Sequence, residues 1–201
     1  MPQPHFISSD ASEVSIEAFK EDPGLPHRLA VFIVSGRPRS GKTTVCAIVA
    51  ALIGAMPVES SSMITGPIED AQGLERGTIE RERLIDAERY RPELIRVANA
   101  MAAEGNSPGL LCVKAGHRLI DGMRRVSEVE DSQTEARNRG LIPLVLFVEN
   151  PKDLARVNDN TESVGLRRIA NAVIVNDSTM EELRYKTARA LGSAIKKVIN
   201  S

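Results

Sequence analysis

The chain has 201 residues, of which 42% are hydrophobic, and its formal net charge is -1. This length and composition predict a single α/β domain. The near-neutral charge excludes a global attraction to nucleic acid or to an anionic membrane, and an aromatic content of 3% without Trp argues against a base-stacking surface.

The first 28 residues are polar and contain four prolines, so we expect an N-terminal extension at 1–28, with a short helix over 12–20 at most. The folded domain is predicted to span 29–201. No apolar stretch is long enough to span a membrane, and no secretory signal is recognised at the start. Cys46 and Cys112 lie in apolar-leaning stretches and predict buried free thiols, which suits a reducing, cytoplasmic location.

The apolar run 29–34 leads into a glycine-rich turn that fits G-x-x-x-x-G-K-[ST], and apolar residues at helical spacing follow it. Strand, glycine loop and helix form the context that a phosphate-binding loop (P-loop) requires. Backbone N–H groups of such a loop surround an anion, the lysine reaches the β- and γ-phosphates, and the hydroxyl after it faces Mg²⁺. We therefore expect ATP and Mg²⁺ to bind here, through Gly36, Arg39, Ser40, Gly41, Lys42, Thr43 and Thr44.

The middle of the chain is less regular. A short second strand is predicted over 57–64, and the next helix is expected from Ile68, with Pro67 just inside its start. Both charges are dense over 75–96, which indicates a solvated helical face, or alternatively one or two arginines directed into a cleft to hold an anionic substrate. A helix over 91–103 is expected to pack on the sheet, whereas 110–115 fits helix or strand.

Asp121 follows two apolar residues in the manner of a Walker B strand end, where an aspartate helps to hold Mg²⁺. The metal site predicted from the sequence therefore combines Thr43 with Asp121. Asp121 is also placed to serve as a base toward a hydroxyl acceptor. Arg124 and Arg125 come next and are candidates for holding the acceptor, because the planar guanidinium suits phosphate oxygens. Lys42, Asp121 and Arg124 are the predicted catalytic residues.

The C-terminal half predicts a polar helix over 126–139, a buried strand over 143–148 and a final strand over 172–175. The last helix should carry Met180, Leu183, Leu191, Ile195 and Val198 on its apolar side. Residues 156–168 look like a mobile loop or short lid, with Arg156, Arg167 and Arg168 as further acceptor-side candidates. Together the elements predict a doubly wound parallel sheet of about five strands, of the P-loop NTPase type, with its site at the carboxyl ends of the strands.

Several of these stretches resemble the deoxynucleoside monophosphate kinases of tailed bacteriophages, within the adenylate/thymidylate-kinase-like group. The matching segments are the P-loop, Gly66–Ala71, Asp121 to Arg124 followed by Glu128, Asn158–Glu162 with its Asn-Asp pair, and Val173–Leu183. The resemblance implies that Asp121 and Arg124 lie at the active site and that the Asn176 turn lies near the adenine of ATP. A phage origin would place the protein in the host cytoplasm.

This chain is shorter than that family between Ala71 and Asp121, where such kinases place much of their acceptor-binding structure. Segment 90–95, followed by Gly105 and Asp121–Arg125, is also compatible with phage kinases that phosphorylate 5-hydroxymethyluracil in DNA. We therefore expect an ATP-dependent kinase acting on a (deoxy)nucleoside monophosphate. The alternatives are a kinase for the hydroxymethyl group of 5-hydroxymethyluracil in DNA, another small-molecule kinase, and a nucleotide-gated regulatory module without turnover. The oligomeric state stays open, a dimer included, and no membrane partner is expected.

Overall fold

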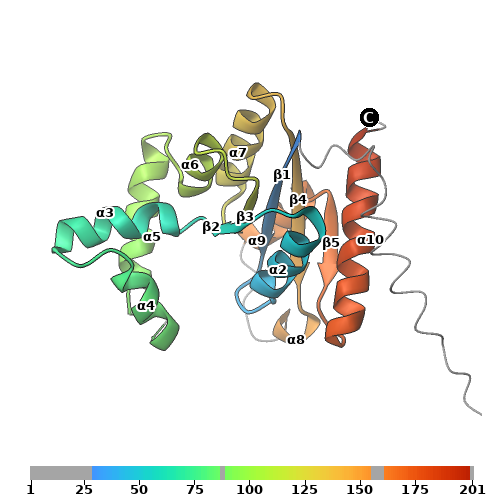
Figure 1. Ribbon diagram of the computed structural model, residues 1–201, viewed down its shortest axis with the longest axis horizontal. Coiled ribbons are helices and arrows are strands. Elements are labelled where there is room, and N and C mark those ends of the chain that lie inside the picture. Colours follow the sequence, from blue (N-terminus) through green and yellow to red (C-terminus); the bar gives the residue numbers. More distant parts are fainter. Residues whose placement is uncertain (1–28, 87–88, 155–160, 200–201) are drawn as a thin grey trace, which may run out of the picture.

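The computed structural model describes residues 29–86, 89–154 and 161–199, and it is built around a five-stranded parallel sheet in the order β2-β3-β1-β4-β5 (Figure 1). The strands are β1 (Ala30–Gly36), β2 (Pro57–Glu59), β3 (Leu119–Met123), β4 (Ile142–Glu149) and β5 (Ala172–Val175). All neighbouring strands run parallel. The predicted fold class is confirmed.

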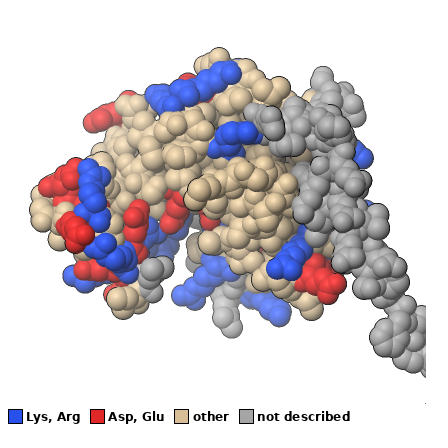
Figure 2. All heavy atoms as spheres, in the orientation of Figure 1, with Lys and Arg blue, Asp and Glu red and all other residues tan. Residues whose placement is uncertain are grey.

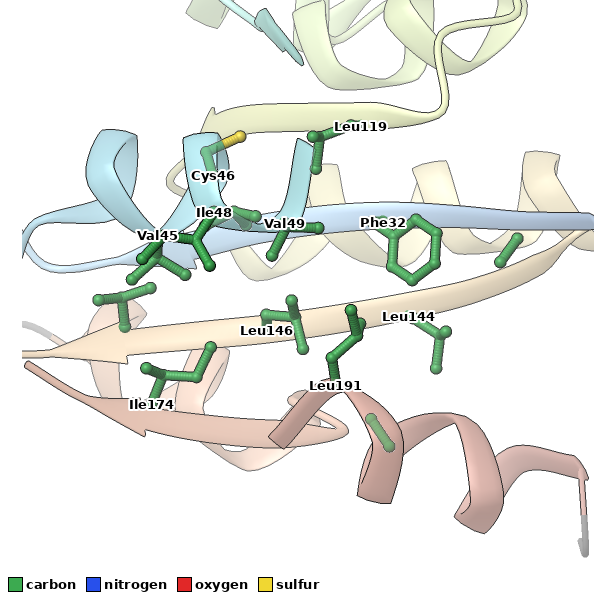
Figure 3. Close-up of a cluster of buried hydrophobic side chains, with 14 of the residues drawn as sticks. Phe32, Val45, Cys46, Ile48, Val49, Leu119, Leu144, Leu146, Ile174 and Leu191 are labelled. Atoms are coloured by element: carbon green, nitrogen blue, oxygen red, sulfur yellow. The ribbon is translucent and has the colours of Figure 1, made fainter. Parts of the chain in front are cut away.

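Helices cover both faces of the sheet. One face carries α2 (Lys42–Ile53) and α10 (Met180–Ile199), and the other carries α6 (Pro108–Lys114), α7 (Val126–Asn138) and α9 (Thr161–Ile169). Successive residues of the central strands point to opposite faces of the sheet. Phe32 packs with Val49 and Leu191 on one face (Figure 3). Ile33 packs on the other face. Burial on both faces explains why these strands are apolar without interruption.

Three further helices form an arm beside the β2 edge of the sheet (Figure 1). They are α3 (Ser62–Gln72), α4 (Thr78–Ile85) and α5 (Arg91–Ala103). Their buried residues Ile64, Ile68, Ile79 and Leu94 form a small cluster separate from the two clusters on the sheet. The bounds of α5 match the prediction, but its expected packing on the sheet is wrong. Helical periodicity shows that one face is buried without showing which element covers it.

The predicted second strand is also too long. β2 ends at Glu59 and α3 begins at Ser62, so Pro67 lies inside a helix instead of near its start. A proline at this position costs the helix one backbone hydrogen bond. Ile64 and Ile68 are one turn apart and are both buried against the other arm helices. That burial offsets the lost bond and keeps the helix continuous through Pro67.

The remaining differences lie in the second half of the chain. Residues 110–115 fall mostly in α6, and β3 continues past Asp121 to Met123. The predicted loop or lid is wrong for 161–168, which lies in α9 with Leu166 buried against the sheet. Met180 is half exposed, contrary to its predicted place on the apolar side of α10. The extension 1–28 and the segment with Arg156 lie outside the described residues.

Within the ranges that the structure describes, no helix combines the length and apolarity needed to cross a membrane. Among the described residues the remaining helix is α8 (Pro151–Leu154), which follows β4 directly, beside the carboxyl edge of the sheet.

Candidate active site

The P-loop lies at the carboxyl edge of the sheet, because β1 ends at Gly36 and α2 begins at Lys42. A Cβ atom on Gly36 would sit 2.2 Å from the carbonyl oxygen of Val148, so the close approach of β4 requires glycine. Arg39 has a φ of 62° and Gly41 a φ of 87°. Backbone in this left-handed region turns successive N–H groups inward, as an anion-binding loop requires.

Lys42 is folded back onto this loop. Its Nζ donates a hydrogen bond to the carbonyl oxygen of Arg37 at 2.7 Å. Burial lowers the pKa of Lys42 and the nearby Arg124 lowers it further, whereas Asp121 and Glu59 act in the opposite direction. A cation that is short of hydration and close to a second cation is stabilised by an anion placed beside it. The position therefore suits phosphate oxygens.

Asp121 is brought to the P-loop by the pairing of β3 with β1. Asp121 lies opposite Val34 in the sheet, and its Oδ2 accepts a hydrogen bond from Thr43 Oγ1 at 3.2 Å. Its Oδ1 is buried and has no hydrogen-bond partner among the described residues. Burial raises the pKa of Asp121, opposed by Lys42 and by the Thr43 hydroxyl. A carboxylate with one unsatisfied oxygen beside a hydroxyl is a donor set that fits Mg²⁺.

The described residues contain no group of three or more His, Cys, Asp or Glu side chains placed to hold a metal. This agrees with the way Mg²⁺ binds in phosphate-transfer sites, where one or two protein groups, several waters and the substrate phosphates share the ion. Thr43 and Asp121 are thus the residues that would hold it, and Mg²⁺ would neutralise charge on the β- and γ-phosphates.

A pocket of about 220 Å³ opens next to these residues, between the ends of β2 and β3 and the helices α3 to α7. The apolar residues of the lining are Ile64, Leu94, Ile95, Ala98 and Pro108. The charged residues of the lining are Glu59, Arg83, Arg91, Arg124, Arg125 and Glu128. A pocket that combines apolar and charged side chains in this way is typical of a small-molecule site.

Positive charge dominates the ionic part of the pocket, because its arginines outnumber its carboxylates by two. Arg83 donates to Glu59 Oε1 at 3.0 Å and to Ser61 Oγ at 3.1 Å. Loss of hydration lowers the pKa of Arg124, and Arg91 lowers it further. The guanidinium groups therefore lie close enough to repel one another. An anionic ligand would relieve this repulsion.

The surface around the pocket carries a different charge pattern. Figure 2 shows both signs intermingled over the arm of α3 to α5, and Lys and Arg residues gathered at the edge of the molecule where the P-loop lies. Several arm arginines pair with neighbouring carboxylates, such as Arg76 with Asp70 and Arg89 with Glu82. These exposed pairs contribute little to stability and form the solvated face that was expected.

Asn176, predicted near the adenine, contacts the P-loop itself. Its Nδ2 donates to the carbonyl oxygen of Ser40 at 3.0 Å, and a Cβ on Gly41 would lie 2.2 Å from the same nitrogen. Its backbone N–H donates to Glu149 at the end of β4. The turn after β5 therefore supports the loop from the side opposite Asp121.

The other predicted residues divide into two groups. Arg124 and Arg125 line the pocket, beside Lys42 and Asp121. Arg167 and Arg168 are exposed on α9 and do not line it; Arg167 pairs with Glu149 at 3.0 Å. Arg39 is exposed on the P-loop, Ser40 is buried beneath it, and Thr44 lies half-buried in α2. Their roles stay predictions.

Four lining residues were not singled out from the sequence as site candidates: Glu59, Arg83, Arg91 and Glu128. Glu59 is the last residue of β2 and lies opposite Asp121 in the sheet, so a recognised strand end would have identified it. Arg83 and Arg91 lie in the mixed-charge segment 75–96. The charge pattern of this segment does not show which side chains face solvent and which face the pocket.

No family model matches the sequence, and no curated protein matches it significantly. The solved structures to which the chain is similar include a gluconokinase from Sinorhizobium meliloti 1021, at 11% identity and a TM-score of 0.44, covering 86% of this chain and 95% of that one. Another is a sugar kinase from Janibacter sp. HTCC2649, at 18% identity and a TM-score of 0.36, covering 83% and 96%. A third, from Chloroflexus aurantiacus J-10-fl, is described provisionally as a kinase (16% identity, TM-score 0.40, covering 82% and 97%).

Similarities at this level identify neither an activity nor a substrate. The function is therefore inferred from the site.

Proposed function

We propose that the protein is an ATP-dependent kinase that transfers the γ-phosphoryl group to a phosphate-bearing acceptor, and that the acceptor is a (deoxy)nucleoside monophosphate. The observation that carries the proposal is the position of the arginine-lined pocket directly beside Lys42 and the Thr43–Asp121 pair. Phosphoryl transfer needs little covalent work from a protein, but it needs cations on both sides of the migrating group.

The donor side is the P-loop. ATP would place its phosphates among the loop N–H groups, and Lys42 would leave the carbonyl oxygen of Arg37 to contact them. Mg²⁺ held by Thr43 and Asp121 would neutralise charge on the β- and γ-phosphates. The left-handed backbone conformation of Arg39 and Gly41, which anion-binding loops use, supports this assignment.

The acceptor side is the pocket. Its excess of two positive charges matches a phosphate monoester, which carries nearly two negative charges near neutral pH. Arg91 and Arg124 would bind the acceptor phosphate, and the apolar lining residues Ile64, Leu94 and Ala98 would contact the base. An acceptor phosphate oxygen then attacks the γ-phosphorus, the bond to the β-phosphate oxygen breaks, and ADP leaves. No protein base is required, because the attacking oxygen is already ionised.

One observation favours a second candidate, a hydroxyl acceptor such as the hydroxymethyl group of 5-hydroxymethyluracil in DNA. Glu59 lines the same pocket, and a carboxylate within reach of a hydroxyl serves as its general base. Glu59 is paired with Arg83 at 3.0 Å, however, so its carboxylate already has a partner in the pocket. An uncharged hydroxyl would also leave the excess positive charge of the pocket arginines without an anionic partner. We therefore favour the monophosphate as acceptor.

The test is transfer of label from γ-labelled ATP with Mg²⁺ to a panel of acceptors offered separately: the common ribo- and deoxyribonucleoside monophosphates, DNA containing 5-hydroxymethyluracil, and a sugar acid such as gluconate. We expect label on a monophosphate. Label only on the DNA or the sugar acid would replace the proposal by the hydroxyl-acceptor reading. Binding of ATP without transfer to any acceptor would indicate a regulatory module.

A further inference from the structure

Glu128 is a buried carboxylate in the lining of the pocket. It is the third residue of α7, and about 9% of its surface is exposed. Burial raises the pKa of Glu128, opposed by two backbone N–H groups and by the charges of Arg125 and Arg124. A carboxylate so far out of water is costly unless its oxygens are bound. Its contacts are therefore informative.

Those contacts join two separate elements. Glu128 Oε1 accepts the N–H of Gly109 in the first turn of α6 at 2.8 Å, and Oε2 accepts the N–H of Arg124, just after β3, at a longer 3.4 Å. The first N–H groups of a helix have no partner within the helix. The residue after a strand end likewise lies beyond the regular pairing of the sheet. The Glu128 side chain thus provides a hydrogen-bond acceptor for one backbone N–H group in each of the two segments.

The two segments that Glu128 holds form one side of the pocket. α6 contributes Pro108, the helix begins directly after Ser107, and the segment after β3 contributes Arg124 and Arg125. α6 also lies close to the end of β3, because a Cβ on Gly109 would come within 2.6 Å of the Met123 side chain. The direction of the Arg124 side chain depends on the backbone that Glu128 fixes.

We propose that Glu128 is the positioning residue of the acceptor pocket, which holds α6 and the Arg124 backbone in the arrangement that binds the acceptor phosphate. The inference rests on the proposed function for the identity of the acceptor. Glu128 itself does not contact the reacting atoms and acts through Arg124. Its loss should therefore weaken acceptor use and leave ATP binding at the P-loop unchanged.

The variant Glu128→Gln tests this with little change of shape. Its amide keeps one oxygen for one of the two N–H groups, but the other N–H then faces an NH₂ group. Hydrogen exchange of the Gly109 and Arg124 amides should accelerate roughly ten-fold for the N–H that loses its partner. Glu130→Gln, an exposed position two residues along α7, is the matched control and should change neither amide. Unchanged exchange at both amides in Glu128→Gln would overturn the proposal, and this readout does not depend on any activity.

The kinetic measurement is a double-mutant cycle with Arg124→Ala. Alone, Glu128→Gln should lower acceptor kcat/KM roughly ten-fold, with the Kd of ATP and the Tm close to wild type. In the Arg124→Ala background it should cost clearly less, because the side chain that it positions through the Arg124 backbone is already gone. Additive losses, or an equal loss of ATP affinity, would contradict a role through Arg124. A wild-type protein that labels no monophosphate would instead refute the proposed function, and the exchange measurement would still decide the role of Glu128.

Discussion

Single residues determine which charge each part of the site presents. Arg124 is the clearest case, because it lines the pocket and also lowers the pKa of Lys42 on the P-loop. The same guanidinium therefore lies between the donor and the acceptor halves. A residue in this position is expected to contact the acceptor phosphate and the migrating group, and it should contribute to turnover more than to ATP binding.

Replacing Arg124 by Ala should reduce kcat/KM for the acceptor by roughly 10- to 100-fold, the loss expected for a charge-assisted hydrogen bond to phosphate. The Kd of ATP, measured by calorimetry, should stay within about two-fold, because the P-loop contacts remain. Arg139→Ala is the matched control, since Arg139 is an exposed arginine paired with Glu135 at the end of α7. Unchanged acceptor kinetics in Arg124→Ala would assign Arg124 to the solvated surface.

The two cysteines make a second prediction at this scale. Cys46 and Cys112 are both buried and free, and burial raises the pKa of each thiol to about 12. At pH 8 only about one thiol in ten thousand is then ionised in the folded protein. A chromogenic disulfide reagent should react with neither cysteine in the native protein and with both in guanidinium chloride. Rapid reaction of the native protein would show that one of these thiols is accessible.

At the scale of elements, the P-loop is held from two sides. Asp121 of β3 contacts it through Thr43, and Asn176, after β5, contacts it through the carbonyl oxygen of Ser40. The two supports come from strands on opposite sides of β1 in the sheet order. A loop whose glycines permit several conformations gains a defined shape from such fixed neighbours.

Asn176→Ala should loosen one of these supports. The loss of one neutral hydrogen bond, about 1 kcal/mol, should raise the Kd of ATP roughly five-fold. Acceptor KM should change less, because Asn176 does not line the pocket. Asn138→Ala, at an exposed position at the end of α7, is the control. Wild-type ATP affinity in the Asn176 variant would mean that the loop keeps its shape without this contact.

The elements also show which strands could be predicted from the sequence and which could not. β1, β4 and β5 were recognised because their apolar residues are continuous and end at turn residues, as in strands covered on both faces. β2 has only three residues, and none of them is fully buried, so its end could not be recognised from the pattern. For the same reason the start of α3 was placed too late.

Across the whole molecule, the sequence named most of the donor half of the candidate site, but of the acceptor half it named individually only Arg124 and Arg125. Lys42 and Thr43 belong to a motif with fixed spacing and a fixed structural context, whereas Asp121 was identified only by its place after two apolar residues of a short strand. Arg83 and Arg91 belong to a run of alternating charges, and only the separate packing of the arm decides which of them faces the pocket. Glu128 lies in a helix predicted to be polar and exposed, whereas α7 buries it against α6.

The central claim is that the P-loop and the arginine-lined pocket form one phosphotransfer site, with Lys42 on its donor side. The most direct measurement is transfer of labelled γ-phosphoryl to a nucleoside monophosphate by the wild type, by Lys42→Ala and by Lys197→Ala, an exposed control on α10, with circular dichroism to verify folding. We predict that the wild type and the control transfer label equally, and that Lys42→Ala folds but loses transfer by at least about 100-fold. Transfer that survives in Lys42→Ala would contradict the account.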